Sequence, residues 1–110
     1  MERIATLRAW LAEKPDDRFA AYALALELEK AGDLVAAEIQ LRRLLERHPG
    51  SGAGHLRLGR LLVAMGRAPE AEIAWRAGLV ALAGVAGTEA KRSIAEIEGD
   101  LRALEEDSNS

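Results

Sequence analysis

Apolar residues recur along this chain at alternating spacings of three and four residues, and short segments containing Gly, Pro or Asp interrupt them at regular intervals. This spacing places the apolar side chains on one face of an α-helix. Because the connections between the apolar segments are short, we expect consecutive helices to be antiparallel neighbours. The pattern predicts six helices, over residues 2–14, 17–30, 34–48, 52–65, 69–83 and 88–106.

The interruptions carry residues suited to ending one helix and beginning the next. In the segment 31–33, Gly32 can take the left-handed conformation that closes a helix, and Asp33 can cap the helix that follows. One of the two Asp residues after Pro15 is the corresponding cap candidate for the helix over 17–30. The breaks are therefore predicted to be tight turns between helices.

The apolar faces predict a core built from both large and small residues. Large residues expected to be buried include Trp10, Leu41 and Leu45. Small residues on the same faces, such as Ala37 and Gly59, allow neighbouring helix axes to approach closely.

The helical pattern also repeats itself every 34 residues (66 − 32 = 34). Gly32 recurs as Gly66, and the tripeptide at 37–39 recurs at 71–73. A further series at this spacing consists of Leu11, Leu45 and Leu79. A fixed period of this length, with two helices in each unit, is typical of arrays of helix–turn–helix repeats.

The repeating positions resemble those of the tetratricopeptide repeat (TPR) family, whose pattern is W-x2-L-G-x2-Y, then A-x3-F, then P. In the first repeat the matching positions are Ala21, Leu24, Ala25, Leu28, Ala37, Leu41 and Pro49. In the second they are His55, Leu58, Gly59, Leu62, Ala71 and Trp75. Other residues replace the Trp and Tyr of the pattern in both repeats. The resemblance implies an all-α fold, a right-handed α-solenoid of about six antiparallel helices.

The resemblance also implies one TPR-like domain over residues 1–107. Its expected parts are a half repeat (2–15), repeats 18–51 and 52–85, a capping helix (88–106) and a tail (108–110). The period fails in the last helix, which instead carries an apolar stripe and charged residues on its other faces, as the end of a solenoid requires. The residues of the stripe are Ile94, Ile97, Leu101 and Leu104. The alternative is that this helix pairs two chains, although it is shorter than three heptads.

Composition and charge exclude several classes of protein. The net charge of −3 provides no positive field for nucleic acid, and the absence of cysteine excludes disulfides and thiolate catalysis. No apolar stretch approaches the roughly 18 residues of a membrane span, and charged residues interrupt the first 14 positions, unlike a signal peptide. We expect a cytoplasmic protein without nucleic-acid or membrane partners.

No grouping of residues indicates catalysis. The two histidines, His48 and His55, flank one turn, and His55 is expected to be packed. A metal site built from these two alone is disfavoured, because a closed zinc site usually has four ligands. We therefore expect no enzyme activity, no cofactor and no metal.

The resemblance implies a binding surface, because the first helix of each TPR pair lines the concave face. The residues expected to form this groove are Phe19, Tyr22, Leu26, Leu56, Arg57, Arg60 and Val63. A ligand that combines an apolar anchor with an acidic residue would suit them. Two alternatives are that the first or last helix covers part of this surface, or that its arginines pair with Glu27 or Glu29.

The function expected from these features is that of an adaptor that binds a partner peptide or helix in the concave groove. The alternatives are a structural unit that self-associates through its C-terminal helix or solenoid ends, and a regulatory fragment of a larger protein. Homo-oligomerisation is compatible with the sequence but not favoured by it.

Overall fold

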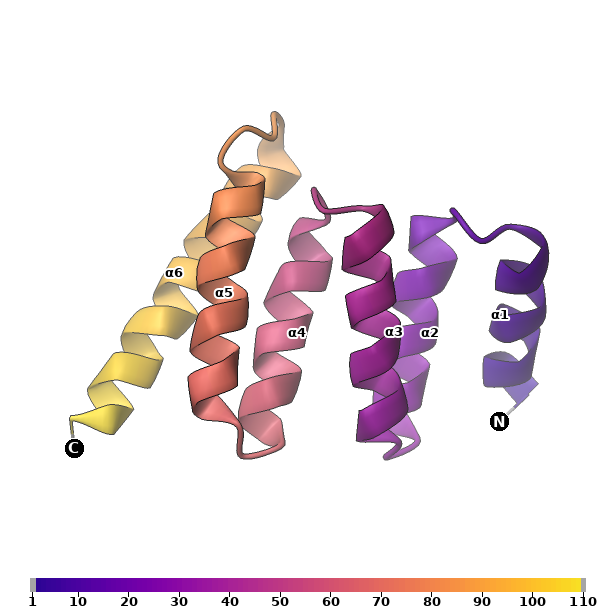
Figure 1. The fold of residues 1–110 in the computed structure, drawn as a ribbon, viewed down its shortest axis with the longest axis horizontal. Helices are drawn as coiled ribbons and strands as arrows, with labels where there is room; N and C mark the ends of the chain where they lie inside the picture. The colour runs from indigo at the N-terminus through magenta and orange to yellow at the C-terminus, as the bar shows by residue number, and fades with distance from the viewer. Residues whose placement is uncertain (1, 110) are drawn as a thin grey trace. The chain divides into compact units, whose positions relative to one another are not determined.

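The computed structural model describes residues 2–109, and these residues form six α-helices and no strand (Figure 1). The helices are α1 (Glu2–Glu13), α2 (Arg18–Lys30), α3 (Leu34–Arg47), α4 (Gly52–Ala64), α5 (Ala68–Leu82) and α6 (Thr88–Ser108). Every predicted helix is present, and each end lies within two residues of its predicted position. The all-α prediction is confirmed.

The chain divides into two compact units, Met1–His48 and Pro49–Ser110. The first contains α1, α2 and α3, and the second contains α4, α5 and α6. The single domain over residues 1–107 stays a prediction, and each unit is described below by itself.

In the first unit α2 packs against both α1 and α3. The core of this unit comes from one face of α2 and one face of α3, whose most buried residues are Leu24, Ala25, Leu28, Ala37, Leu41 and Leu44. By contrast, α1 contributes no fully buried residue. It therefore covers α2 without being enclosed itself.

Two residues predicted to be buried in this unit are not. Trp10 is 45% exposed, because α1 is covered on one side only and the indole N–H bonds to a carboxylate at the surface. Leu45 is half-buried, whereas its neighbour Leu44 is 2% exposed. The core face of α3 therefore runs through Leu41 and Leu44, at a spacing of three rather than four.

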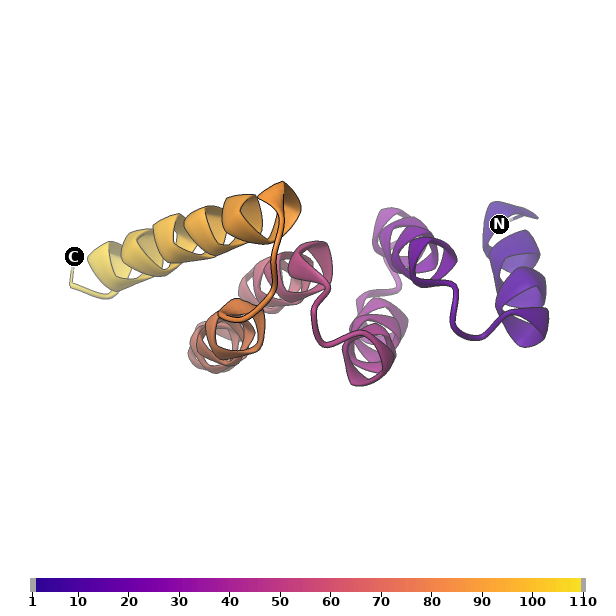
Figure 2. The ribbon, with the colours of Figure 1, turned by 90° about the horizontal axis from the view of Figure 1, so that it is seen from above.

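In the second unit α4 packs against α5, and α6 packs against both of them (Figure 2). The contact between α4 and α5 requires glycine at two points. A Cβ added at Gly59 would overlap the indole of Trp75, and one added at Gly78 would lie 2.9 Å from the Cβ of His55. Because neither glycine has a side chain, the buried aromatic rings occupy that space. The close approach predicted at Gly59 is confirmed.

The turn after α2 and the turn after α4 have the same geometry. Gly32 and Gly66 both have positive φ, of 82° and 76°. At Gly32 the amide donates to Glu29 O, and the next amide donates to Leu28 O, which is the Schellman pattern. Asp33 then accepts from Ala36 N at 3.2 Å and caps α3. The turn predicted from these residue types is confirmed.

The buried face of α6 differs from the predicted stripe by a small rotation. Its buried residues are Ala90, Ser93, Ile97 and Leu101, and the predicted Ile94 and Leu104 are only half-buried. The reason lies in α4, where a Cβ at Gly52 would overlap Ser93. The missing side chain lets the serine face of α6 pack against α4.

The predicted tail at 108–110 also needs correction. Ser108 belongs to α6, and its hydroxyl donates to Leu104 O at 3.1 Å. Asn109 is the C-cap, and Ser110 lies outside the described residues. Within residues 2–109, no helix has the length and apolarity needed to cross a membrane.

Candidate partner-binding surface

Three of the predicted groove residues share one face of α2. Phe19, Tyr22 and Leu26 follow one another at spacings of three and four, opposite the buried face that contains Leu24. Phe19 is 76% exposed, and Tyr22 and Leu26 are half-buried. The guanidinium of Arg18 lies 5.3 Å from the centre of the Phe19 ring. This face of α2 is an apolar stripe with a cation at one end.

A single carboxylate fixes the start of this helix. Asp17 caps α2 by accepting from Ala20 N at 3.0 Å, and its second oxygen accepts from the indole N–H of Trp10 at 2.8 Å. Two donors hold the pKa of the Asp17 carboxyl below its ordinary value: the Ala20 N–H, which is the larger cause, and the Trp10 indole. The same carboxylate thus caps α2 and holds α1 beside it.

One predicted groove residue of α4, Arg60, is tied to α6 by ion pairs. Arg60 Nε donates to Asp100 Oδ2 at 2.7 Å, and its Nη2 lies 3.9 Å from Glu96 Oε2. Glu27, considered above as a partner of these arginines, pairs with Arg3 at 3.0 Å. The C-terminal helix thus supplies carboxylates to Arg60. This result matches the alternative in which the last helix covers part of the predicted surface.

A pocket of about 220 Å³ lies beside Arg60 in the second unit. It has contributions from α4, α5 and α6, and its lining residues are Arg60, Val63, Trp75, Asp100, Ala103, Leu104 and Asp107. The indole N–H of Trp75 donates to Leu56 O at 3.2 Å, which fixes the ring against α4. Two predicted groove residues, Arg60 and Val63, therefore border one pocket.

The predicted groove residues fall into two groups. Phe19, Tyr22 and Leu26 belong to the first unit, and the residues on α4 belong to the second. Each group occupies the partly exposed side of its own helix. That the two groups form one continuous groove stays a prediction.

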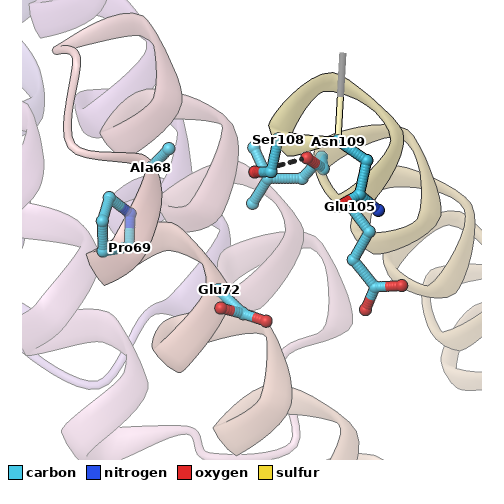
Figure 3. A pocket seen from close by; sticks show the side chains of 7 residues that line it. Ala68, Pro69, Glu72, Glu105, Ser108 and Asn109 are labelled. Carbon is cyan, nitrogen blue, oxygen red and sulfur yellow. Dashed lines mark hydrogen bonds between the residues drawn. The ribbon is translucent and has the colours of Figure 1, made fainter.

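A second pocket in this unit was not foreseen from the sequence. It has a volume of about 430 Å³ and lies between the start of α5 and the end of α6, where Ala68 and Pro69 face Ser108 and Asn109 (Figure 3). Beside it, Arg76 bridges Glu72 and Glu105 at 3.1 and 3.2 Å. No sequence signal marks this pocket, because it depends on where α6 crosses α5.

The two histidines have structural contacts. His55 is 8% exposed, and its Nε2 lies 2.7 Å from Pro49 O, so the expectation that it is packed is confirmed. Nε2 of His48 lies 2.9 Å from Asp16 O. In residues 2–109, no three His, Asp or Glu side chains are grouped so that they could hold a metal ion.

Comparison with known proteins gives three results. The sequence pattern described as "Tetratricopeptide repeat" matches residues 1–82. The structure is similar to the solution NMR structure of a tetratricopeptide repeat domain protein from Salinibacter ruber, with 23% identity and a TM-score of 0.72. That similarity covers 83% of this chain and 89% of the other. No curated protein matches the sequence of this chain. The helical-repeat fold predicted from the period is confirmed.

Proposed function

Because the chain belongs to the tetratricopeptide repeat family, we propose that it is a non-enzymatic adaptor that binds a peptide or helix of a partner protein. A role as a helical-repeat module for protein interaction follows from the family in general terms. The specific proposal is that the partner contacts the predicted groove residues on α2 and α4, and that this takes place in the cytoplasm.

The observation that carries this proposal is the exposed face of α2. A single exposed apolar residue needs no explanation, but Phe19, Tyr22 and Leu26 form a continuous stripe at helical spacing. Two of the three are aromatic, and Arg18 lies against Phe19. Aromatic residues and arginine are enriched at the centres of protein interfaces. The stripe is therefore suited to an apolar anchor of the partner.

The charged residues on α4 suggest the rest of the ligand. Arg57 and Arg60 are three residues apart and share a helix face. Arg60 already binds Asp100, so a carboxylate of the ligand would have to displace Asp100 from it. Arginine can hold a carboxylate through two parallel hydrogen bonds. We propose that the ligand places an acidic residue at these arginines.

The test is a pull-down from source lysate, analysed by mass spectrometry, with a Phe19→Ala/Tyr22→Ala variant. The matched control is Ile73→Ala/Val80→Ala on α5, because these residues are 70% and 79% exposed and lie outside the proposed surface. We expect the α2 variant to keep its helical circular dichroism and lose the partner, while the control keeps it. An α2 variant that retains every partner of the wild type would refute the assignment.

A further inference from the structure

We propose a second binding surface, in the first unit and on another side of α2, that takes an acidic amphipathic helix of a partner protein. The surface is a groove between α1 and α3, and α2 forms its floor. It goes beyond the function proposed above, because it uses none of the residues assigned there.

Two adjoining cavities form the groove. Their volumes are about 430 and 300 Å³, and they share Leu11, Gln40 and Arg43. The first is lined by Arg8, Leu11, Ala12, Leu24, Leu28, Ala36, Ile39, Gln40 and Arg43. The second adds Pro15, Ala21, Leu44, Arg47 and His48. The shared residues come from both α1 and α3, so the two cavities adjoin each other along the groove.

The floor of the groove is apolar. Leu24 and Leu28 of α2 are 3% exposed, and they lie on the face opposite Phe19 and Leu26. On the α3 side, Ile39 is 48% exposed. The accessible apolar surface of the groove therefore comes from its walls, through Ile39 of α3 and the half-buried Leu11 of α1, while Leu24 and Leu28 close its base on a face of α2 distinct from the stripe proposed above.

The rim of the groove is basic. No acidic residue lines either cavity, whereas Arg8 and Arg43 rise from opposite walls. Arg47 also lines the groove, but Asp16 neutralises it. Within residues 2–109, neither Arg8 nor Arg43 makes a hydrogen bond or ion pair. Two unpaired cations above an apolar floor are complementary to a segment with apolar and acidic side chains.

The difference between two adjacent arginines supports this interpretation. Arg42 pairs with Glu38, four residues before it, at 3.0 Å. At the same spacing Arg43 has Ile39 before it and Arg47 after it. Glu46 stands three residues after Arg43, but within residues 2–109 no ion pair joins the two side chains, so Arg42 has a bound carboxylate and Arg43 has none. A carboxylate from outside the chain would satisfy Arg43.

The shape of the groove favours a helical ligand. Its α3 wall runs from Ala36 to Arg47, which corresponds to roughly 16 Å or three helical turns. Its walls and floor are helices, whose side-chain ridges interdigitate with those of another helix. A helix with apolar residues at i, i+4 and i+7 and flanking carboxylates meets both the floor and the rim.

The test uses a fluorescein-labelled helical peptide of about three turns, with Leu at i, i+4 and i+7 and Glu at the flanking positions. Its binding to the full chain is measured by fluorescence anisotropy and mapped by amide chemical shifts. Control peptides replace Glu by Gln or scramble the order of the residues. The protein variants are Arg43→Gln, its matched neighbour Arg42→Gln, and the charge reversal Arg8→Glu/Arg43→Glu.

We expect saturable binding that weakens about tenfold in Arg43→Gln and with the Gln peptide, because charge-assisted hydrogen bonds are lost. Arg42→Gln should bind as the wild type does, and a peptide with Lys in place of Glu should bind the charge-reversed variant. Shifts should appear at Leu11, Gln40 and Leu44.

Several outcomes would overturn the proposal. They are no binding up to the solubility limit, equal binding of the scrambled peptide, shifts that map to α4–α6, and full competition by inorganic phosphate alone. A concentration-dependent increase in molar mass that the charge reversal abolishes would also overturn it, by making a second copy of this chain the occupant.

Discussion

Individual glycines determine how closely the helices of the second unit approach. At Gly59 the missing side chain leaves room for the indole of Trp75, which is 3% exposed and donates to a carbonyl of α4. Gly99 of α6 has a different environment, because an added Cβ there would have only the flexible end of Arg102 near it, at 3.8 Å. Packing thus requires glycine at position 59, whereas the space around position 99 would accommodate a side chain.

Replacing Gly59 by Ala should therefore lower the free energy of unfolding by about 2 kcal/mol or more, because the methyl group would force the Trp75 ring out of its place. Gly99→Ala is the matched control and should raise that free energy by about 0.5–1 kcal/mol, because alanine costs less conformational entropy in a helix. Urea denaturation of both variants measures the difference. A Gly59→Ala variant as stable as the wild type would show that α4 and α5 do not meet at this point.

Among the helices, α1 has the weakest attachment within the first unit, because it buries no residue completely. Its attachment to α2 includes Arg3 with Glu27, and Trp10 with Asp17. Ion pairs at the surface contribute little stability. The bond from Trp10 to the capping carboxylate is therefore the specific contact that couples α1 to the start of α2.

This contact should make the docking of α1 depend on pH. The folded-state pKa of Asp17 is lowered, so its stabilising contribution is fully present above the ordinary value of 3.8 and is lost as the pH falls through the lower folded value. The indole N–H resonance of Trp10 should shift in that acidic range. An Asp17→Asn variant serves as the control and should lose this shift. An identical titration in both proteins would contradict the assignment.

In the molecule as a whole, α6 completes the second unit. It contacts α4 and α5 through Ile97 and Leu101, and through the pair of Arg60 with Asp100. These contacts agree with the capping role expected of a terminal helix in a repeat protein. Its apolar face is used within the chain, which leaves less of it for pairing with a second copy.

Truncation after Thr88 should therefore destabilise the second unit and expose apolar surface. Each unit contains one tryptophan, Trp10 in the first and Trp75 in the second. The exposed Trp10 can be replaced by Phe, so that fluorescence reports Trp75 alone. We expect the truncated chain to unfold at lower urea concentration and to aggregate at rising concentration, as measured by light scattering. A truncated chain that stays folded and monomeric would instead place α6 in a partner interface.

The 34-residue period, the apolar spacing and the turn residues were sufficient to predict the six helices and the repeat family. These features are local or periodic: Gly32 and Asp33 form their turn with neighbours in the chain, and helical spacing defines one face of each helix. The division of α2 into a buried and an exposed face was likewise predictable, because helical spacing places Phe19 and Leu26 opposite Leu24 whatever surrounds the helix.

Contacts between distant segments could not be predicted in this way. The choice of Leu44 over Leu45, the burial of Ser93 and the pairing of Arg60 with Asp100 all depend on how one helix is rotated against another. A rotation of a few tens of degrees exchanges neighbouring residues at such a contact, and the apolar pattern of a single helix is too broad to fix it. The unpaired Arg8 and Arg43 became recognisable as one rim only when packing brought the walls of the groove together around α2.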